Sequence, residues 1–570
     1  MITRFAVLVL VTAFVSLGQS ARGDEPEPAD LVMVNGGIYT MDPADPWAEA
    51  MAIRDGLIVA VGSNEDVGPL TGPRTRIVDL TGRMALPGFH DVHIHPLGGG
   101  YTLLGCSLLD LPSVDAILDQ LKTCAQKQPE GWLHGVGFDL SLFPGAAMDK
   151  AMLDEWFPDR PVYLTASDGH SGWVNSKALE TAGIEADTPN PRGGEIVRDP
   201  ATGEATGTLR DTAMNLFDAL LPAKTLETDV AALRAAQDYL TPLGVTSIIE
   251  IAGSTRDWDA FQAMERAGDL HLRVNSSLVY GPYAEYPPED FESIWAGREQ
   301  YRSELINTDS IKLFLDGGLE GQSAALVEPY LVDPPHKGKL NFAPDELDRL
   351  VTRFDSEGIQ VHMHAIGDRA VREGLDAVQA ALEANGQRDN RHHITHLQLV
   401  HPDDYPRFAK LNVTANFQAL WAYPDTWIMK LNLPVVGQAR VDRMYPIASI
   451  LRAGGRIAGS SDWDVSSANP LDAIETAIRR QDANQPSGPI LNANERVDLP
   501  TMLRAYTVNG AWLMHHERST GALRPAMQAD VAVLDRSLFG IPATEINEAK
   551  VVMTVFGGKV VFEAPPPVGK

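Results

Sequence analysis

The sequence predicts an α/β protein: a (β/α)8 TIM barrel with large insertions and a small β-sandwich domain formed from both chain ends. In the middle of the chain, short apolar segments alternate with longer helical stretches, which is typical of βα units that build a parallel sheet. Both ends instead read as short strands separated by glycine turns. The 570 residues exceed one small domain, so we expect a core barrel with attached parts.

The two ends supply the predicted β-sandwich. Residues 52–63 read as a hairpin around an Asp-Gly turn, and residues 551–563 read as a hairpin around a Gly-Gly turn. Because two β-rich ends flank a large middle in which strands alternate with helices, we expect the ends to form one domain. Its two parts are residues 24–85 and residues 511–570.

Eight apolar segments that end in polar residues predict the barrel. A barrel of eight βα units needs roughly 250 residues, fewer than the region assigned to it, residues 86–510. This region must therefore carry an insertion, which we place at about residues 105–225, where turns are frequent. The predicted barrel strands are residues 88–95, 162–168, 245–250, 311–316, 360–364, 392–396, 413–418 and 456–462.

The first residues predict export. Arg4 precedes an apolar run over residues 5–17 and then small residues, which is typical of a signal peptide, here residues 1–23. The run is shorter than the roughly 20 residues that span a membrane. We expect a periplasmic or secreted protein with no membrane span after signal removal. In such a compartment Cys106 and Cys124 could pair or stay free, and the sequence leaves both open.

The charge balance limits the partners. A formal net charge of -29 argues against nucleic acid, whose phosphates need Lys and Arg. It also argues against an anionic membrane surface, and it favours solubility. A small-molecule substrate is the expected partner, and a homo-oligomer stays open.

The strongest local motif is the pair His93 and His95. Two residues apart on a predicted strand, they point to one face and can chelate one metal ion. Alternatively, they are two partly exposed histidines on an edge strand.

Four more candidate ligands stand at or near the ends of predicted strands: Lys312, His364, His396 and Asp462. A buried, charged Lys312 would be costly. Carboxylation by CO2 would make it an anionic carbamate that bridges two metals, whereas a lysine that reaches solvent needs no such change. Each of the others has a structural alternative, such as a helix cap for Asp462. Because catalytic groups gather at the C-terminal strand ends of a TIM barrel, the set suits two Zn2+ or similar divalent metal ions.

The order of these residues resembles the amidohydrolase superfamily, and longer motifs resemble its YtcJ-like branch, amidohydrolase family 3, which includes N-substituted formamide deformylases. One departure is a threonine in His393-Ile-Thr-His, where the branch commonly shows glutamate. A second is His362, which could be an alternative ligand because it lies two residues from His364. The motifs are Asp168-Gly-His-Ser-Gly-Trp-Val-Asn-Ser-Lys-Ala-Leu, Gly203-Glu-Ala-Thr-Gly-Thr-Leu-Arg, His364-Ala-Ile-Gly-Asp-Arg-Ala, Ser461-Asp-Trp and Ala529-Asp-Val-Ala-Val-Leu.

The resemblance implies a metal-dependent hydrolase that cleaves a non-peptide carbon–nitrogen bond of an amide-like substrate. A metal-bound hydroxide would attack the carbonyl carbon. The implied ligands are His93, His95 and Asp462 for the first metal, His364 and His396 for the second, and carboxylated Lys312 between them.

The resemblance also implies catalytic and substrate-binding residues. Asp462 would act as the acid/base, and His170 would contact the substrate or transition state. Trp173 and Asn175, from the same segment, are expected to bind substrate. Trp173, Trp421 and Trp463 could wall an apolar pocket or simply pack.

Other functions remain open at this point. The same metals would also serve a lactone or cyclic amide hydrolase, or a deaminase. A periplasmic metal-dependent binding protein is an alternative from another class, and it predicts a lost ligand, which the sequence does not show.

Overall fold

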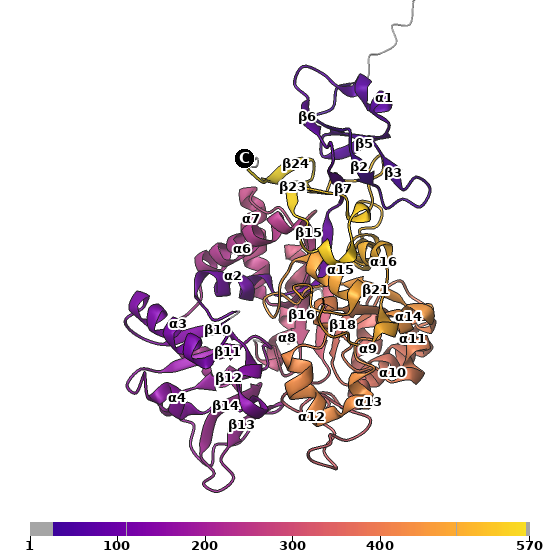
Figure 1. The fold of residues 1–570 in the computed structure, drawn as a ribbon. Coiled ribbons are helices and arrows are strands. Elements are labelled where there is room, and N and C mark those ends of the chain that lie inside the picture. The colour runs from indigo at the N-terminus through magenta and orange to yellow at the C-terminus, as the bar shows by residue number, and fades with distance from the viewer. Residues whose placement is uncertain (1–26, 110, 285, 486, 566–570) are drawn as a thin grey trace, which may run out of the picture.

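The computed structural model describes residues 27–109, 111–284, 286–485 and 487–565. The predicted signal peptide lies outside these ranges. Figure 1 shows a central barrel, a β-sandwich at one end of it and an inserted α/β unit at its side. Within the described ranges, no helix combines the length and apolar character that a membrane crossing needs.

The central unit is a sheet of eight parallel strands, which confirms the predicted TIM barrel. Helices pack against the strands through one apolar face; α10 (Asp368–Asn385), for example, buries Val371, Leu375 and Val378 at helical spacing. The strands are β8 (Phe89–Ile94), β15 (Val245–Gly253), β16 (Arg273–Tyr280), β17 (Ile306–Phe314), β18 (Gln360–Ala365), β19 (His393–His396), β20 (Thr414–Phe417) and β21 (Arg456–Gly459).

Hydrogen bonds join the first and last strands of the barrel. The Asp462 N–H donates to the His93 carbonyl at 2.8 Å, and the His95 N–H donates to the Trp463 carbonyl at 2.8 Å. These bonds hold the end of β8 against the segment that follows β21. Three predicted ligands therefore meet at this seam.

One predicted barrel strand is wrong. Residues 162–168 contain β11 (Val162–Ala166), which belongs to the inserted sheet, and β16 takes the vacant place in the barrel. The apolar pattern of β16 is interrupted by Ser276 and Ser277. Both are buried and bonded inside the sheet, Ser276 to Glu250 at 2.7 Å and Ser277 to Ser310 at 2.8 Å.

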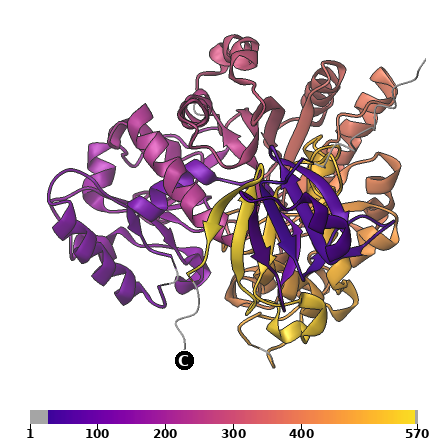
Figure 2. The same cartoon turned by 90° about the horizontal axis from the view of Figure 1, so that it is seen from above.

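Strands from both chain ends form the β-sandwich, as Figure 2 shows from above. β22 (Val531–Leu534) runs antiparallel to β7 (Met84–Pro87), so the two ends share one sheet. The predicted Asp55-Gly56 turn is confirmed, and both residues have the positive φ that a tight hairpin turn requires, 51° and 80°. The remaining strands are β1 (Leu31–Val34), β4 (Ala50–Arg54), β5 (Leu57–Gly62) and β6 (Arg76–Asp79) in one sheet, and β2 (Gly37–Tyr39), β3 (Trp47–Ala48), β23 (Val551–Phe556) and β24 (Lys559–Glu563) in the other.

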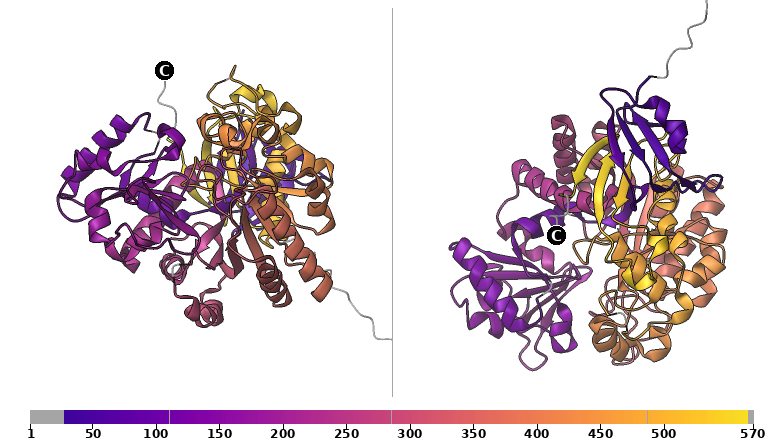
Figure 3. Two further views of the ribbon diagram at one scale, coloured as in Figure 1. Left: turned by 90° about the horizontal axis from the view of Figure 1, so that it is seen from below. Right: turned by 45° about the horizontal axis from the view of Figure 1, so that its top comes forward.

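The insertion lies between α2 (Pro96–Leu104) and α6 (Leu226–Leu240), and both panels of Figure 3 show it beside the barrel. It has its own apolar core, built around Leu121, Phe138 and Trp173. Cys106 and Cys124 form a disulfide within it, which resolves the open pairing. Its six-stranded sheet contains β9 (Cys106–Ser107), β10 (Leu133–Phe138), β11, β12 (Ser171–Val174), β13 (Gly194–Arg198) and β14 (Ala205–Asp211).

The remaining helices cover the barrel, the insertion and the sandwich. They are α1 (Asn64–Val67), α3 (Val114–Lys127), α4 (Lys150–Asp154), α5 (Ser176–Thr181), α7 (Thr255–Ala267), α8 (Phe291–Gly297), α9 (Pro344–Ser356), α11 (Tyr405–Lys410), α12 (Leu433–Val436), α13 (Gln438–Val441), α14 (Ile447–Arg452), α15 (Pro470–Arg479), α16 (Leu499–Ala505) and α17 (Val508–Leu513).

Candidate metal centre and cavity

The His-x-His pair converges on one carboxylate oxygen. His93 Nε2 and His95 Nε2 each lie 3.1 Å from Asp462 Oδ1. His93 is buried at the end of β8, whereas His95 begins α2 and is partly exposed. The two imidazoles therefore face the same point, as their spacing predicts.

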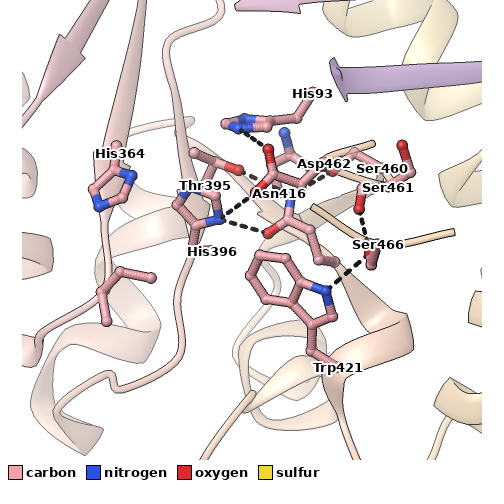
Figure 4. A network of polar contacts seen from close by, with 12 residues as sticks. His93, His364, Thr395, His396, Asn416, Trp421, Ser460, Ser461, Asp462 and Ser466 are labelled. Atoms are coloured by element: carbon pink, nitrogen blue, oxygen red, sulfur yellow. Dashed lines mark hydrogen bonds and ion pairs between the residues drawn. The ribbon is translucent and has the colours of Figure 1, made fainter. Parts of the chain in front are cut away.

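His396 completes a three-residue cluster with His93 and Asp462. One ligand atom from each lies within 4.8 Å of the other two, and all three residues are buried. Figure 4 shows the three side chains directed toward one another, with His364 on the neighbouring strand. His396 and Asp462 have φ values of 75° and 57°, a conformation that is uncommon for residues other than glycine. Such backbone conformations cluster at functional sites.

Lys312 and His364 lie on the two neighbouring strands β17 and β18. The side chain of Lys312 is completely buried, which excludes a lysine that reaches solvent. Its Nζ and His364 Nε2 have no hydrogen-bond partner among the described residues. The His364 ring lies 4.5 Å from the His396 ring, between centroids. The structure thus brings all six predicted ligands to the same end of the barrel.

The protonation states suit metal ligands. Burial, together with neighbouring cationic groups, holds the pKa of His93 and of His364 well below the usual range, so both imidazoles are neutral. Burial opposes charge on Asp462, but its electrostatic and hydrogen-bond interactions with His93, His95 and His396 outweigh burial and keep the Asp462 pKa well below its usual value. Burial lowers the pKa of Lys312 to about 7. Neutral imidazoles, a carboxylate and buried groups without partners are a donor set that fits borderline divalent ions.

Neighbouring polar groups orient two of these imidazoles. His93 Nδ1 lies 2.8 Å from His362 Nε2, and His396 Nδ1 lies 2.8 Å from Gln418 Oε1. Gln418 in turn donates to Ser460 at 2.7 Å. Such contacts fix the tautomer and direction of a ligand histidine. In this structure His362 contacts His93 and orients its imidazole.

His170 reaches the centre from the insertion. Its ring lies 5.2 Å from the His364 ring, and its Nδ1 lies 2.7 Å from Asp211 Oδ1. Tyr283 donates to the same Asp211 oxygen at 3.1 Å. Burial disfavours the charged imidazolium, but the hydrogen bond and charge of Asp211 outweigh burial and raise the pKa of His170 to about 9.

Trp173 and Asn175 hold the insertion together and do not line the cavity. Trp173 is buried in the core of the insertion, and its Nε1 donates to the Asp149 carbonyl at 3.0 Å. The Asn175 side chain accepts from the Ala178 N–H at the start of α5 and from the Val162 N–H. Their side chains are thus occupied by structural contacts.

A cavity of about 830 Å³ opens over the ligand cluster. The barrel supplies one side and the insertion supplies another, including His170. Trp421 and Trp463 line it, and Trp421 stacks on His396 with 5.6 Å between ring centroids and 7° between planes. This is the size of a pocket for a small molecule.

Sequence reasoning did not single out Asp211, Gln418 or His362 as supports. Asp211 lies 41 residues from His170, so no local spacing links them. The sequence suggests His362 only as an alternative metal ligand, not as a support for His93. These residues are set by contacts between elements, which a single sequence does not display.

Known proteins share this architecture and sequence. Residues 76–562 match the Amidohydrolase family. The chain is 30% identical to the putative amidohydrolase YtcJ of Bacillus subtilis over 93% of its length and 98% of that protein. It is 25% identical to the N-substituted formamide deformylase of Arthrobacter pascens, over 94% and 98%. A solved structure of an uncharacterized metal-dependent hydrolase from Pyrococcus horikoshii is 25% identical with a TM-score of 0.70, over 90% and 99%. The chain therefore belongs to the amidohydrolase family, in its YtcJ-like branch, and is a metal-dependent hydrolase.

Proposed function

We propose that this enzyme hydrolyses a non-peptide carbon–nitrogen bond of a small amide-type substrate. The observation that carries the proposal is the buried convergence of His93, His396 and Asp462 beneath a cavity, with His95, His364 and Lys312 beside them. The similarity to an N-substituted formamide deformylase supports an N-substituted formamide or related amide as the substrate class.

The six ligand residues would hold two divalent ions, Zn2+ or a similar metal. His93, His95 and Asp462 would serve the first ion, and His364 and His396 the second. Carboxylated Lys312 would bridge them. Its burial without a hydrogen-bond partner among the described residues supports this modification. Divalent ions in such a site lower the pKa of water and polarise a carbonyl oxygen.

Two side chains would move or hold protons during the reaction. The Asp462 carboxylate would accept a proton from the attacking water and deliver it to the leaving nitrogen. His170, held by Asp211 through Nδ1, would present Nε2–H to the oxygen that gains negative charge. Asp462 and His170 both line the cavity, so both can reach a bound substrate.

Metal content tests the proposal first. We expect about two equivalents of metal per chain in the wild-type protein, measured by elemental mass spectrometry, and a sharp loss in His93→Ala. The matched control is His401→Ala, which replaces a partly exposed histidine outside the cavity and should leave the metal content unchanged. A folded wild-type protein that takes up no metal when Zn2+ is supplied would overturn the proposal.

A substrate panel then tests the bond. N-substituted formamides, other amides, lactones and aminated bases should be assayed with the metal-loaded protein and with Asp462→Asn. We expect amide hydrolysis that falls about 10²-fold or more in the variant while its metal is retained. Lactone or aminated-base turnover without amide turnover would replace the amide by one of the other substrate classes.

We also propose that the protein is exported. The predicted signal peptide and the Cys106–Cys124 disulfide support this, because disulfides persist in oxidising compartments. Fractionation of cells that express the full chain with a C-terminal tag, with the N-terminus of the product determined, checks it. Uncleaved protein in the cytosolic fraction would contradict export.

A further inference from the structure

The cavity wall is strongly acidic beyond the ligand cluster. Within the described part of the chain, no lysine or arginine lines it. None of its seven additional carboxylates forms an ion pair with a described lysine or arginine. These are Asp139, Asp168, Glu320, Asp425, Asp464, Asp472 and Asp482.

Glu320 and Asp425 form the least compensated part of this wall. Burial, with Glu320 and Asp139 adding like charge, raises the pKa of Asp425 to about 7. Burial and Asp168 likewise raise the pKa of Glu320. The hydrogen bond that Asp425 Oδ1 accepts from the Ile428 N–H, at 2.7 Å, does not offset these effects. No described lysine or arginine forms an ion pair with either carboxylate, and the charge of His170 offsets only part of these effects on Glu320.

The nearest arginine does not supply that cation. Arg210 lies close enough to Asp168 and Glu320 to be affected by their charges, but it does not line the cavity. Its guanidinium donates to Ser171 Oγ and to the Ala146 carbonyl. Asp168 accepts hydrogen bonds from the His170 N–H and from Ser171 Oγ, whereas Glu320 has no arginine partner and is available to a ligand.

A second feature of the same cavity wall, the buried amide of Asn432, also indicates a ligand. Asn432 is completely buried and lines the cavity, and neither Nδ2 nor Oδ1 is within full hydrogen-bond distance of a partner in the described ranges. Its amide lies near enough to Glu320 to favour the charged form of that carboxyl. Buried amide groups are rarely left unpaired. Tyr423 and Trp427 line the same region with aromatic rings, which attract cations through their faces.

We propose that the substrate carries a protonated nitrogen, such as an ammonium, amidinium or guanidinium group, which Glu320 and Asp425 receive at the cavity wall. Asn432 would hydrogen-bond the same end of the substrate. This inference rests on the proposed hydrolysis, since the scissile amide of the same substrate would lie over His93 and Asp462. The enzyme would then select basic amides over neutral or anionic ones.

Three matched substrates test the selection. They are N-benzylformamide, its 4-aminomethyl derivative and its 4-carboxymethyl derivative, which are neutral, cationic and anionic. We expect kcat/KM of the metal-loaded wild type to be at least about tenfold higher for the cation than for the neutral amide, because a charged hydrogen bond contributes that much. Glu320→Gln and Asp425→Asn should each reduce this ratio. Glu130→Gln removes one exposed carboxylate outside the cavity and should leave the ratio unchanged.

A binding measurement separates this inference from the hydrolysis. Calorimetry with benzamidinium and its neutral analogue acetophenone needs no turnover. Tighter binding of benzamidinium to the metal-loaded wild type, weakened in Glu320→Gln but not in Glu130→Gln, supports the cation site even if no amide is hydrolysed. Equal binding of the two ligands, or amide hydrolysis with no preference for the cationic substrate, would overturn the cation site while leaving the hydrolysis intact.

Discussion

The burial of Lys312 bears on the chemical state of its side chain. Its ammonium would be completely buried with no hydrogen-bond partner among the described residues, an arrangement that a charged lysine strongly disfavours. A carbamate on Nζ would give it oxygen atoms for two metal ions, and the neighbouring His364 and Asp462 would complete the sites. The burial that makes the free lysine unfavourable is therefore consistent with a modified one.

Carboxylation of Lys312 is directly observable. We expect metal-loaded protein prepared with ¹³C-labelled CO2 to show a carbamate carbon signal by NMR, because CO2 would bind covalently at Nζ. Lys312→Met should lack the signal and retain about one metal equivalent at most. A wild-type protein with two metals and no carbamate signal would rule out the bridge.

His90 predicts how stability depends on pH. It is completely buried, and its ring nitrogens contact Thr520 Oγ1 at 3.1 Å and the Gly88 carbonyl at 3.2 Å. Burial lowers its pKa to about 3 in the folded protein, whereas the unfolded value is about 6.5. Below pH 6.5 the unfolded chain therefore binds a proton that the folded chain does not, and the stability from His90 is lost as pH falls toward 3.

The variant His90→Gln isolates this contribution. Urea unfolding should be measured between pH 7 and pH 5. As the pH is lowered, the free energy of unfolding should fall less steeply in the variant than in the wild type, and the two slopes should differ by up to about 1.4 kcal/mol per pH unit. The other buried histidines are present in both proteins and cancel in the comparison. Parallel curves for the two proteins would contradict the assignment.

At the scale of elements, strand prediction succeeded where apolar residues continue and failed where they do not. Seven of the eight predicted segments correspond to barrel strands. β16 was missed because its buried serines interrupt the apolar pattern. Their hydroxyls donate hydrogen bonds to Glu250 of β15 and Ser310 of β17, which are distant in sequence. Conversely, β11 has the composition of a buried parallel strand because it is one, paired with β10 in the insertion.

The disulfide belongs to this scale because it joins two elements of the insertion. It links Cys106 of β9 to Cys124 of α3, 18 residues apart, with both side chains buried. Closing a loop of this length restricts the unfolded chain and contributes about 3 kcal/mol. Replacing both cysteines by serine should lower the stability of the insertion by about this amount, measured by chemical unfolding, and should speed proteolysis within residues 106–211. Unchanged stability, or two reactive thiols in the unfolded wild type without reductant, would contradict the pairing.

At the scale of the whole molecule, the active cavity is a product of two units. Candidate ligands could be predicted from the sequence because metal chemistry restricts the residue types and each stands at or near a strand end. The sequence could not predict the residues that orient the histidines, Asp211 and Gln418. It also could not predict the acidic cavity wall at Glu320 and Asp425. They depend on contacts between residues that are far apart in the sequence. Asp211 reaches His170 within the insertion, Gln418 reaches His396 from the neighbouring barrel strand, and Glu320 and Asp425 come from two separate loops of the barrel.

A buried ion pair connects the barrel to the β-sandwich. Arg273 of β16 donates to Asp530 Oδ2 at 2.7 Å, with 6% and 2% of the side chains exposed. Asp530 Oδ1 also accepts from the Gly557 N–H at 2.8 Å, within the hairpin of the last two strands. Breaking such a pair from one side leaves a buried charge without a partner, whereas replacing both partners by apolar residues removes the problem.

This contrast gives a test of how tightly the two units are coupled. Asp530→Ala should lower the free energy of unfolding by about 3–5 kcal/mol. Arg273→Met combined with Asp530→Leu should recover part of the loss, as measured by chemical unfolding. The exposed pair of Arg234 and Asp269, with half of each side chain accessible, is the matched control, and Asp269→Ala should cost about 1 kcal/mol or less. If Asp530→Ala costs no more than Asp269→Ala, the ion pair does not couple the sandwich to the barrel. Other contacts between the two units, such as the hydrogen bond that Thr554 Oγ1 donates to the Thr241 carbonyl at 2.6 Å, would then have to do so.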